Sequence, residues 1–352
     1  MRELCTCIAL LCLTLVLSGS SVAKNAMPLA SPMGGHTFSS GGPFLGGITS
    51  GPDGNMWFTE RNGVGTISSS GRVREYPLSL REPLLGAIAS GIDRSIWFIA
   101  ADAIGRITMT GRVSIYQLRP DSSPPTAITA GPDGRMWFTV NSQDNDRNYI
   151  GTISTRGLIT YHRVPTAYSL VSGIALGPDG NLWFCESNTN KIGRISPTGR
   201  ISEFALPKPK GTSYSSFPQS IVSDGHRYLW FTQLIREIGR IDLRGHVVEY
   251  MLPRSSSGQP ATIVSNKGKS FWFTELYSNK VGRITSTGHA TEMSLPTPNS
   301  GPLGIALGRD GNFWITQTCS NTISKVTPAG AVTVYPVART PYQAKAYCIS
   351  SV

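Results

Sequence analysis

The chain has 352 residues, and its 32 Lys and Arg against 21 Asp and Glu give a formal net charge of +11 at pH 7. Beyond the first residues no segment is apolar enough to cross a membrane, which argues against a membrane span. A nucleic-acid-binding protein would cluster basic residues with exposed aromatic ones, whereas many arginines here recur in one repeated phrase, which predicts a structural role and no nucleic-acid partner. These arginines are Arg106, Arg194, Arg240 and Arg283. The remaining positive charge is interpreted as solubility or weak affinity for anionic surfaces.

Residues 1–23 are typical of a secretory signal peptide. Arg2 is followed by the apolar run Ile8–Leu17 and then by the small residues Ser21, Val22 and Ala23. We therefore expect a secreted or periplasmic protein. Asn-x-Ser/Thr sequons are absent from the sequence, which favours export from a bacterium over secretion by a eukaryotic cell. Residues 24–42 form an N-terminal segment before the first repeat.

The sequence repeats from residue 43 to residue 337. Each repeat holds one copy of a phrase that reads GPDGNMWFTE in the first repeat, and the tryptophans follow one another at 40 to 47 residues. This period is typical of four-stranded propeller blades. The tryptophans are Trp57, Trp97, Trp137, Trp183, Trp230, Trp272 and Trp314. The predicted blades lie near residues 43–80, 83–119, 125–165, 168–207, 216–253, 258–296 and 300–337.

Within a repeat, four strands alternate with glycine turns. The fourth repeat divides into residues 172–180, 181–186, 191–199 and 200–207, and we name these strands A to D from the channel outward. One blade cannot bury both faces of its sheet alone, so the tryptophans are predicted to be structural and to fill the space between neighbouring blades. The sequence thus predicts an all-β fold, a seven-bladed β-propeller. Residues 338–352 exceed the repeats, and they either add a closing strand or lie across the last blade.

Three cysteines follow the signal peptide, and an odd number excludes a fully paired set within one chain. Cys185 lies two residues after Trp183, which predicts a buried apolar residue. Cys319 and Cys348 either form a bridge that pins the tail or remain free thiols. Free thiols are favoured because the sequence does not supply the geometry that a disulfide demands.

The repeat phrases resemble those of a known family. GPDGNLWFCESNTNKIGRISPTGRISEFALP (177–207) and FWFTELYSNKVGRITSTGHATEMSLPTPNSGPLGIALGRDGNFWIT (271–316) are similar to the repeats of virginiamycin B lyase, the streptogramin lyase family. The resemblance covers about residues 43–337. It implies a seven-bladed propeller and a carbon–oxygen lyase activity, in which Mg²⁺ and a histidine base open a cyclic depsipeptide by elimination.

Elimination needs a base that takes the proton next to a carbonyl and a cation that stabilises the developing charge. The resemblance places the histidines at the second position of a Pro-His-x-Ile phrase that opens strand A. This chain has Ala261 and Leu303 at that position. Gly301 stands where the family has a metal-associated glutamate, and Phe44 and Leu45 stand near the expected tyrosine of the first blade.

The five histidines do not replace the missing base. His226 falls in an A–B turn, and His246 and His289 lie in or beside C–D turns, all at the end of the propeller opposite the family's site. His36 precedes the first repeat. His162, late in a D strand, is the one histidine within the repeats that is placed toward the top face, which carries the B–C and D–A connections.

The top face also carries the candidate ligand-binding residues. Polar side chains end the B strands of five blades, either to hydrogen-bond a neighbouring blade or to bind a ligand or a cation such as Ca²⁺ or Mg²⁺. Two longer connections, 141–149 and 208–218, extend the same face, and the first contains a D-x-D-x-N spacing that could begin a calcium loop. The candidates are Glu60, Glu186, Gln233, Glu275 and Gln317 on the strands, and Asp144, Asp146, Asn148, Lys208, Lys210 and Tyr214 in the connections.

Three functions remain open. The first, favoured by the missing histidines, is a monomeric binding or scaffold propeller of the streptogramin-lyase type that takes a small molecule, a peptide or a sugar at the top face. The second is a lyase that opens cyclic depsipeptides with Mg²⁺. The third is a metal-dependent lactonase-type hydrolase.

Overall fold

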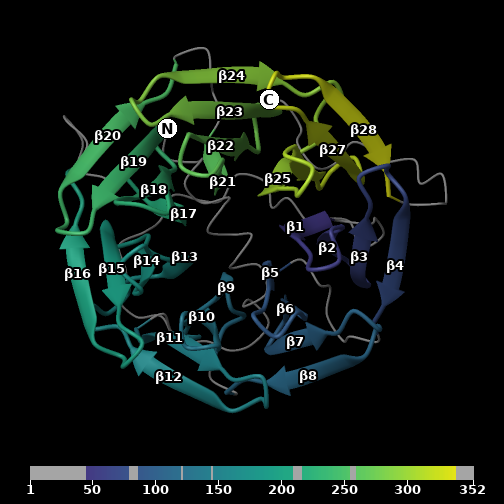
Figure 1. The fold of residues 1–352 in the computed structure, drawn as a ribbon. Coiled ribbons are helices and arrows are strands. Elements are labelled where there is room, and N and C mark those ends of the chain that lie inside the picture. Colours follow the sequence, from purple (N-terminus) through teal and green to yellow (C-terminus); the bar gives the residue numbers. More distant parts are fainter. Residues whose placement is uncertain are drawn as a thin grey trace, which may run out of the picture.

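The computed structural model describes residues 45–78, 86–119, 122–143, 146–208, 216–253 and 259–337. It contains seven sheets of four antiparallel strands, each built from consecutive strands and arranged as blades in a ring (Figure 1). The prediction of a seven-bladed, all-β propeller is therefore confirmed. No helix in the described ranges is long and apolar enough to cross a membrane.

The strands of each blade follow the order A to D from the centre outward (Figure 1). The A strands are β1 (Leu45–Ser50), β5 (Ile88–Ser90), β9 (Ile128–Ala130), β13 (Val171–Leu176), β17 (Pro218–Ser223), β21 (Pro260–Ser265) and β25 (Pro302–Leu307). The B strands are β2 (Met56–Glu60), β6 (Ile96–Ala100), β10 (Met136–Asn141), β14 (Leu182–Glu186), β18 (Tyr228–Gln233), β22 (Ser270–Glu275) and β26 (Phe313–Gln317). The C strands are β3 (Gly63–Ile67), β7 (Ala103–Ile107), β11 (Asn148–Ile153), β15 (Lys191–Ile195), β19 (Glu237–Asp242), β23 (Lys280–Thr285) and β27 (Thr322–Val326). The D strands are β4 (Val73–Pro77), β8 (Val113–Gln117), β12 (Ile159–Arg163), β16 (Ile201–Ala205), β20 (Val247–Met251), β24 (Ala290–Ser294) and β28 (Val332–Pro336).

The seven tryptophans fill the junctions between blades, as predicted. Each is at most 3% exposed. Trp183 of β14, for example, packs with Leu229 and Phe231 of the next blade. Five indole N–H groups also donate a hydrogen bond to the aspartate of the preceding A–B turn, as Trp183 does to Asp179 at 3.1 Å. The GPDG turn thus fixes the orientation of the ring that the next blade packs against.

A second repeated contact lies on the outer side of six of the seven tryptophans. In six blades an aromatic side chain of the D strand stacks on it, as Tyr250 does on Trp230 with ring centroids 5.5 Å apart. The glycine of the next blade's C–D turn then covers that aromatic ring. A Cβ atom built on Gly288 would lie 2.1 Å from the Tyr250 ring, so no larger residue fits there.

Alanine at these turn glycines should separate packing from backbone strain. Gly288 and Gly330 have φ angles of 92° and 93°, but a Cβ on Gly330 would meet only the Met293 sulfur, at 4.0 Å. Both substitutions carry the cost of a left-handed backbone, on the order of 1 kcal/mol. We expect Gly288→Ala to be the more destabilising by about 1–3 kcal/mol, because the methyl group collides with Tyr250. Urea unfolding of the two variants measures the difference, and equal losses would contradict the steric role of the aromatic contact.

The first and last blades close the ring without sharing a strand in the described part of the chain. Thr316 and Thr318 donate side-chain hydrogen bonds to the carbonyls of Gly46 and Leu45, at 2.6 and 2.7 Å. Trp314 packs in one apolar cluster with Leu45 and residues of β2. The tail 338–352, with its two alternative placements, lies outside the described residues.

The cysteines and arginines of the repeats have structural surroundings. Cys185 is a free thiol, fully buried beside Trp183, as predicted. Cys319 is disulfide-bonded, so the preference for a free thiol at this position was wrong, and Cys348 lies outside the described residues. Arg194 lies over the Trp183 ring and donates to the carbonyl of Leu243 in the next blade. Similar stacking of Arg106 and Arg240 on tryptophans supports the structural interpretation of the repeated arginine.

Candidate functional site

Strand A begins with a bulge at the top of the channel. In five blades the register of strand A against strand B shifts between the first and fourth residues, as between Pro260 and Ile263. A bulge redirects side chains, and it often lies beside a functional site. The bulge contains the second position of strand A, at which the family resemblance places the catalytic histidines.

The backbone at this second position is held by the neighbouring blade. Thr232 and Thr274, each one residue before the end of a B strand, donate hydrogen bonds to the carbonyls of Ala261 and Leu303 at 2.9 and 2.8 Å. Both acceptor residues are half-buried. The scaffold therefore positions the residue well, but methyl and isobutyl groups cannot accept a proton. Around the ring the second positions carry no titratable side chain: Gly46, Gly86, Thr126, Ser172, Gln219, Ala261 and Leu303.

The position expected to hold a metal-associated glutamate also does not fit that role. Gly301 adopts a φ of 63°, and a Cβ built on it would lie 2.6 Å from the sulfur of the disulfide-bonded Cys319. A larger residue therefore cannot occupy this site without displacing Cys319. No cluster of three His, Cys, Asp or Glu side chains suited to a metal ion occurs among the residues that the structure describes. The residues at this end of β25 do not fit Mg²⁺, and no catalytic step is derived through it.

Several candidate residues at the ends of the B strands belong to a network between blades. Gln233 and Gln317 are fully buried and donate hydrogen bonds to Ser216 and Ser300, which precede the A strands of the same two blades. Those serines in turn donate to asparagines of the preceding blade, as Ser300 does to Asn279 at 2.6 Å. These glutamines thus connect neighbouring blades. Whether any of them also contacts a ligand remains a prediction.

Asn141 is a member of this ring that the sequence analysis missed. Its side-chain amide donates to the carbonyl of Val171 and accepts from the amide of Val171, at 3.1 and 2.9 Å. It therefore acts as an additional strand residue for the neighbouring blade. The sequence carried a signal for this role, because Asn141 ends a B strand as Glu186 does, but Asn141 was interpreted as the first residue of a long loop.

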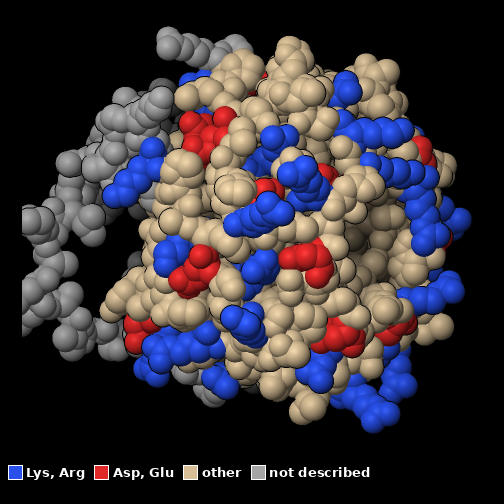
Figure 2. All heavy atoms as spheres, turned by 60° about the vertical axis from the view of Figure 1, so that its left-hand side comes forward, with Lys and Arg blue, Asp and Glu red and all other residues tan. Residues whose placement is uncertain are grey.

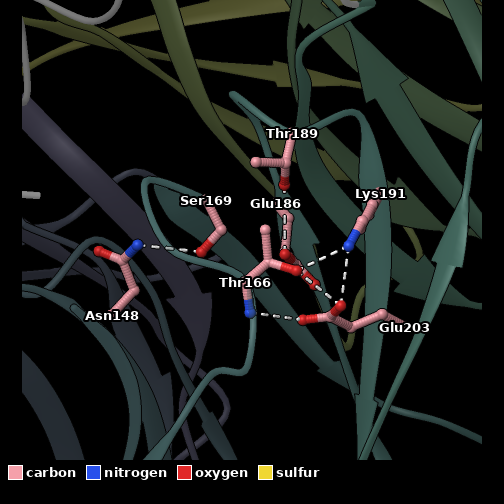
Figure 3. A network of polar contacts seen from close by, with 7 residues as sticks. All are labelled: Asn148, Thr166, Ser169, Glu186, Thr189, Lys191 and Glu203. Carbon is pink, nitrogen blue, oxygen red and sulfur yellow. Dashed lines mark hydrogen bonds and ion pairs between the residues drawn. The ribbon is translucent and has the colours of Figure 1, made fainter. Parts of the chain in front are cut away.

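A denser polar network lies between the third and fourth blades (Figure 3). Lys191 of β15 contacts Glu203 of β16 at 2.8 Å and Thr166 at 2.6 Å. Thr166, from the connection after β12, donates both its amide and its hydroxyl to Glu203. Glu186 of β14 lies beside them and accepts one hydrogen bond from Thr189 at 3.2 Å. Its other oxygen, Oε1, has no hydrogen-bond partner among the described residues.

Folding shifts the pKa values of the two carboxyl groups of this network, Glu186 and Glu203, in opposite directions. Burial, with the nearby charge of Glu203, raises the pKa of Glu186 to about 7. For Glu203 burial opposes ionisation, but hydrogen bonds from Lys191 and Thr166 outweigh it and lower the pKa. In the first blade, which has Gly63 where the fourth has Lys191, burial and Glu75 raise the pKa of Glu60 to about 7. The B-strand carboxyl therefore has a raised pKa in both blades, with or without the lysine, whereas Lys191 lowers the pKa of Glu203.

The candidate residues of the two long connections, 141–149 and 208–218, contribute less to a shared top-face site than the sequence analysis expected. Asn148 is fully buried and donates to Ser169 at 2.9 Å, whereas Asp146 bonds Ser142 and Arg147 in the loop. The two side chains thus have different partners, and with Asp144 outside the described residues the calcium loop stays a prediction. Lys208 is exposed beyond β16. Asp144, Lys210 and Tyr214 lie outside the described residues.

The four histidines of the described residues lie away from the second positions of the A strands, and His36 lies outside the described residues. His226, His246 and His289 lie on the A–B and C–D turns, as predicted, and are exposed. The placement of His162 toward the top face was wrong. Its ring stacks on Trp137 with centroids 5.9 Å apart, and a Cβ on the turn residue Gly199 would lie 2.4 Å from its Nδ1. Burial and the charge of Arg135 lower its pKa, which fits a packed neutral ring.

Fold and site together define a seven-bladed propeller whose A strands open in a bulge at the top of the channel. A profile of the virginiamycin B lyase family matches residues 35–234 and 211–351. The chain belongs to the virginiamycin B lyase family. Its predicted membership is thereby confirmed.

Solved structures agree with this assignment. A streptogramin B lyase structure is 35% identical, with a TM-score of 0.71, over 83% of this chain and 93% of that one. A catalytically inactive histidine-to-alanine variant of virginiamycin B lyase from Staphylococcus aureus, solved with quinupristin, is 33% identical, with a TM-score of 0.70, over 80% of this chain and 94% of that one. The WD40 propeller domain of Doa1, 10% identical with a TM-score of 0.62 over 84% of this chain and 93% of that one, shares the fold alone. Among curated protein sequences no match was found.

Proposed function

We propose that this protein is an exported ligand-binding propeller that keeps the lyase scaffold without the lyase's proton acceptor. The observation that supports it most is the pair Ala261 and Leu303, held by interblade threonines at the second positions of β21 and β25. In the S. aureus enzyme, an exchange of one histidine for alanine accompanies loss of catalysis. The ligand would bind at the top face, near the bulges and the connections 141–149 and 208–218.

The chemistry explains why the side chain at this position decides the activity. In the elimination a base takes the proton from the carbon beside the one that bears the ester oxygen; an alkene forms between these two carbons as the carbon–oxygen bond breaks, and the electron pair of that bond leaves with the carboxylate. The linear product has gained an alkene and an acid and is an isomer of the cyclic substrate. Without a proton acceptor held within hydrogen-bond reach, the first of these transfers has no route.

Incubation with quinupristin and Mg²⁺ tests the proposal. Because the product is an isomer, it is detected by chromatographic retention and fragmentation and not by intact mass. We expect no ring-opened product above a protein-free control, while an active family lyase in a parallel tube converts the antibiotic. Steady conversion by this chain would overturn the proposal and restore the lyase function, with a base elsewhere on the top face.

A further inference from the structure

The bottom face of the propeller carries a large set of exposed basic side chains. Because neighbouring strands of a blade are antiparallel, the A–B and C–D turns lie at one end of every blade, which we call the bottom face. Ten exposed Arg and Lys side chains stand on these turns, at least one in each of the seven blades. The A–B turns, toward the channel, carry Arg94, Arg227, Lys267, Lys269 and Arg309, and the C–D turns, toward the rim, carry Arg72, Arg112, Arg156, Arg200 and Arg244.

These ten cations are not neutralised within the described part of the chain. None of them forms an ion pair there, although seven ion pairs occur among the described residues, four of which join aspartates of these turns to other basic groups. The carboxylates of the same turns are engaged in local contacts. Five aspartates accept the indole N–H of a tryptophan, as Asp53 does, and Asp224 and Asp242 accept backbone N–H groups of their own turns. The ten exposed basic groups thus outnumber the seven aspartates of the same turns.

The positive charge is concentrated on this end of the molecule. The B–C and D–A connections and adjoining strand ends at the top expose four described cations, Arg119, Arg147, Arg163 and Lys208. Figure 2 shows basic side chains projecting from the side of the disc, with fewer acidic ones among them. Solubility alone would be served by charges of both signs spread over both faces. An excess of one sign on one face instead favours binding of an anionic partner there.

The arrangement of the cations selects a flat partner over a linear one. Together they cover all seven blades: those nearer the channel lie in the second, fifth, sixth and seventh blades, and those nearer the rim lie in the first to fifth. A linear polyanion would cross such a disc along one line and contact only some of them, whereas a planar surface contacts both sets at once. We propose that the bottom face docks the protein flat on an anionic lipid surface, with the top face turned toward the solution.

Vesicle cosedimentation tests this docking with the full-length protein. We expect binding to vesicles of phosphatidylcholine with phosphatidylglycerol, no binding to pure phosphatidylcholine, and loss of binding at about 0.5 M salt. Equal binding to both vesicle types, or no binding to either, would overturn the proposal without any variant. Tighter binding of duplex DNA than of anionic vesicles would show that the face serves a linear polyanion instead.

Two double variants remove the same charge, one from the bottom face and one from the top. They distinguish binding through the bottom face from binding through overall net charge. Arg112 and Arg156 precede β8 and β12 at the bottom, and Arg119 and Arg163 lie at the top ends of the same two strands. Each basic residue near an anionic membrane contributes about fivefold to the binding constant, so Arg112→Gln with Arg156→Gln should weaken vesicle binding about 25-fold. Arg119→Gln with Arg163→Gln removes the same charge and should change binding less than about threefold. An equal loss in both double variants would mean that overall charge, and not the bottom face, binds the vesicles.

Discussion

Replacing Trp183 with alanine is expected to lower the free energy of unfolding by about 3–5 kcal/mol, the cost of a large buried side chain and the cavity that it leaves. The indole lies between two blades, packed with Leu229 and Phe231 and stacked on Phe204 with centroids 5.3 Å apart. The cavity would therefore open at the junction that joins the fourth and fifth blades. Urea unfolding followed by circular dichroism measures the loss, and a cost well below 2 kcal/mol would show that this residue does not hold the blades together.

Comparing the stability loss of Trp183→Phe with that of Trp272→Phe distinguishes the contribution of the indole hydrogen bond from that of packing. Trp183 donates its indole N–H to Asp179, whereas the Trp272 N–H has no partner among the described residues, because the sixth blade has no aspartate in its A–B turn. Trp183→Phe should therefore be the more destabilising, by about 1 kcal/mol. The reverse order would contradict the role given to the GPDG turn.

Glu186→Gln is expected to stabilise the protein at pH 7.5 by on the order of 1–3 kcal/mol and to have almost no effect near pH 4.5. The pKa of Glu186 rises from 4.5 to about 7 on folding, so between these values the folded protein binds the proton and the unfolded chain has released it. Stability of the native sequence therefore falls as pH rises through this range. Glutamine is neutral at all pH values, so the variant lacks the fall in stability that ionisation of Glu186 causes as pH rises. Gln233 and Gln317 already occupy the equivalent position in two other blades.

Glu203→Gln provides the matched control. The pKa of Glu203 is lowered on folding, so its ionised form stabilises the native state above its unfolded pKa, and this contribution is lost as pH falls. The substitution should destabilise the protein at pH 7.5, opposite in sign to Glu186→Gln. Thermal unfolding between pH 4.5 and 8 compares the two, and the same sign for both would contradict the charge assignment within this network.

The sequence predicts the scaffold well because each strand carries local signals. The tryptophan two or three residues into the B strand and the glycine of the C–D turn recur in all seven blades, and an aspartate four residues before the tryptophan recurs in five, so their placement needs no knowledge of distant contacts. Family membership follows from the same phrases. The missing histidines at positions 261 and 303 were equally visible, because they occur within a repeated phrase.

Contacts between blades were harder to predict. His162 occupies the position at which other blades have tyrosine or phenylalanine, and its packing is evident only when Trp137 and Gly199 are brought to it from two blades. Asn141 and Asn148 were interpreted as loop residues because their partners, Val171 and Ser169, lie some 20 to 30 residues away. The positive charge of the bottom face was also hard to predict, because each repeat contributes only one or two of its basic residues.

Deuterium exchange gives the most direct test of the central claim, that the family scaffold is present without a proton acceptor at the top of the channel. Quinupristin is incubated with the protein in D₂O. Mass spectrometry and NMR then measure deuterium on the carbon beside the one that bears the ester oxygen, which is the carbon that the elimination deprotonates. We predict no deuterium at this carbon and no ring opening beyond the protein-free control, since Ala261 and Leu303 cannot take the proton. Deuterium at that carbon in the recovered cyclic substrate, or ring opening, which leaves no hydrogen on that carbon, would show that a base acts there and would contradict the claim.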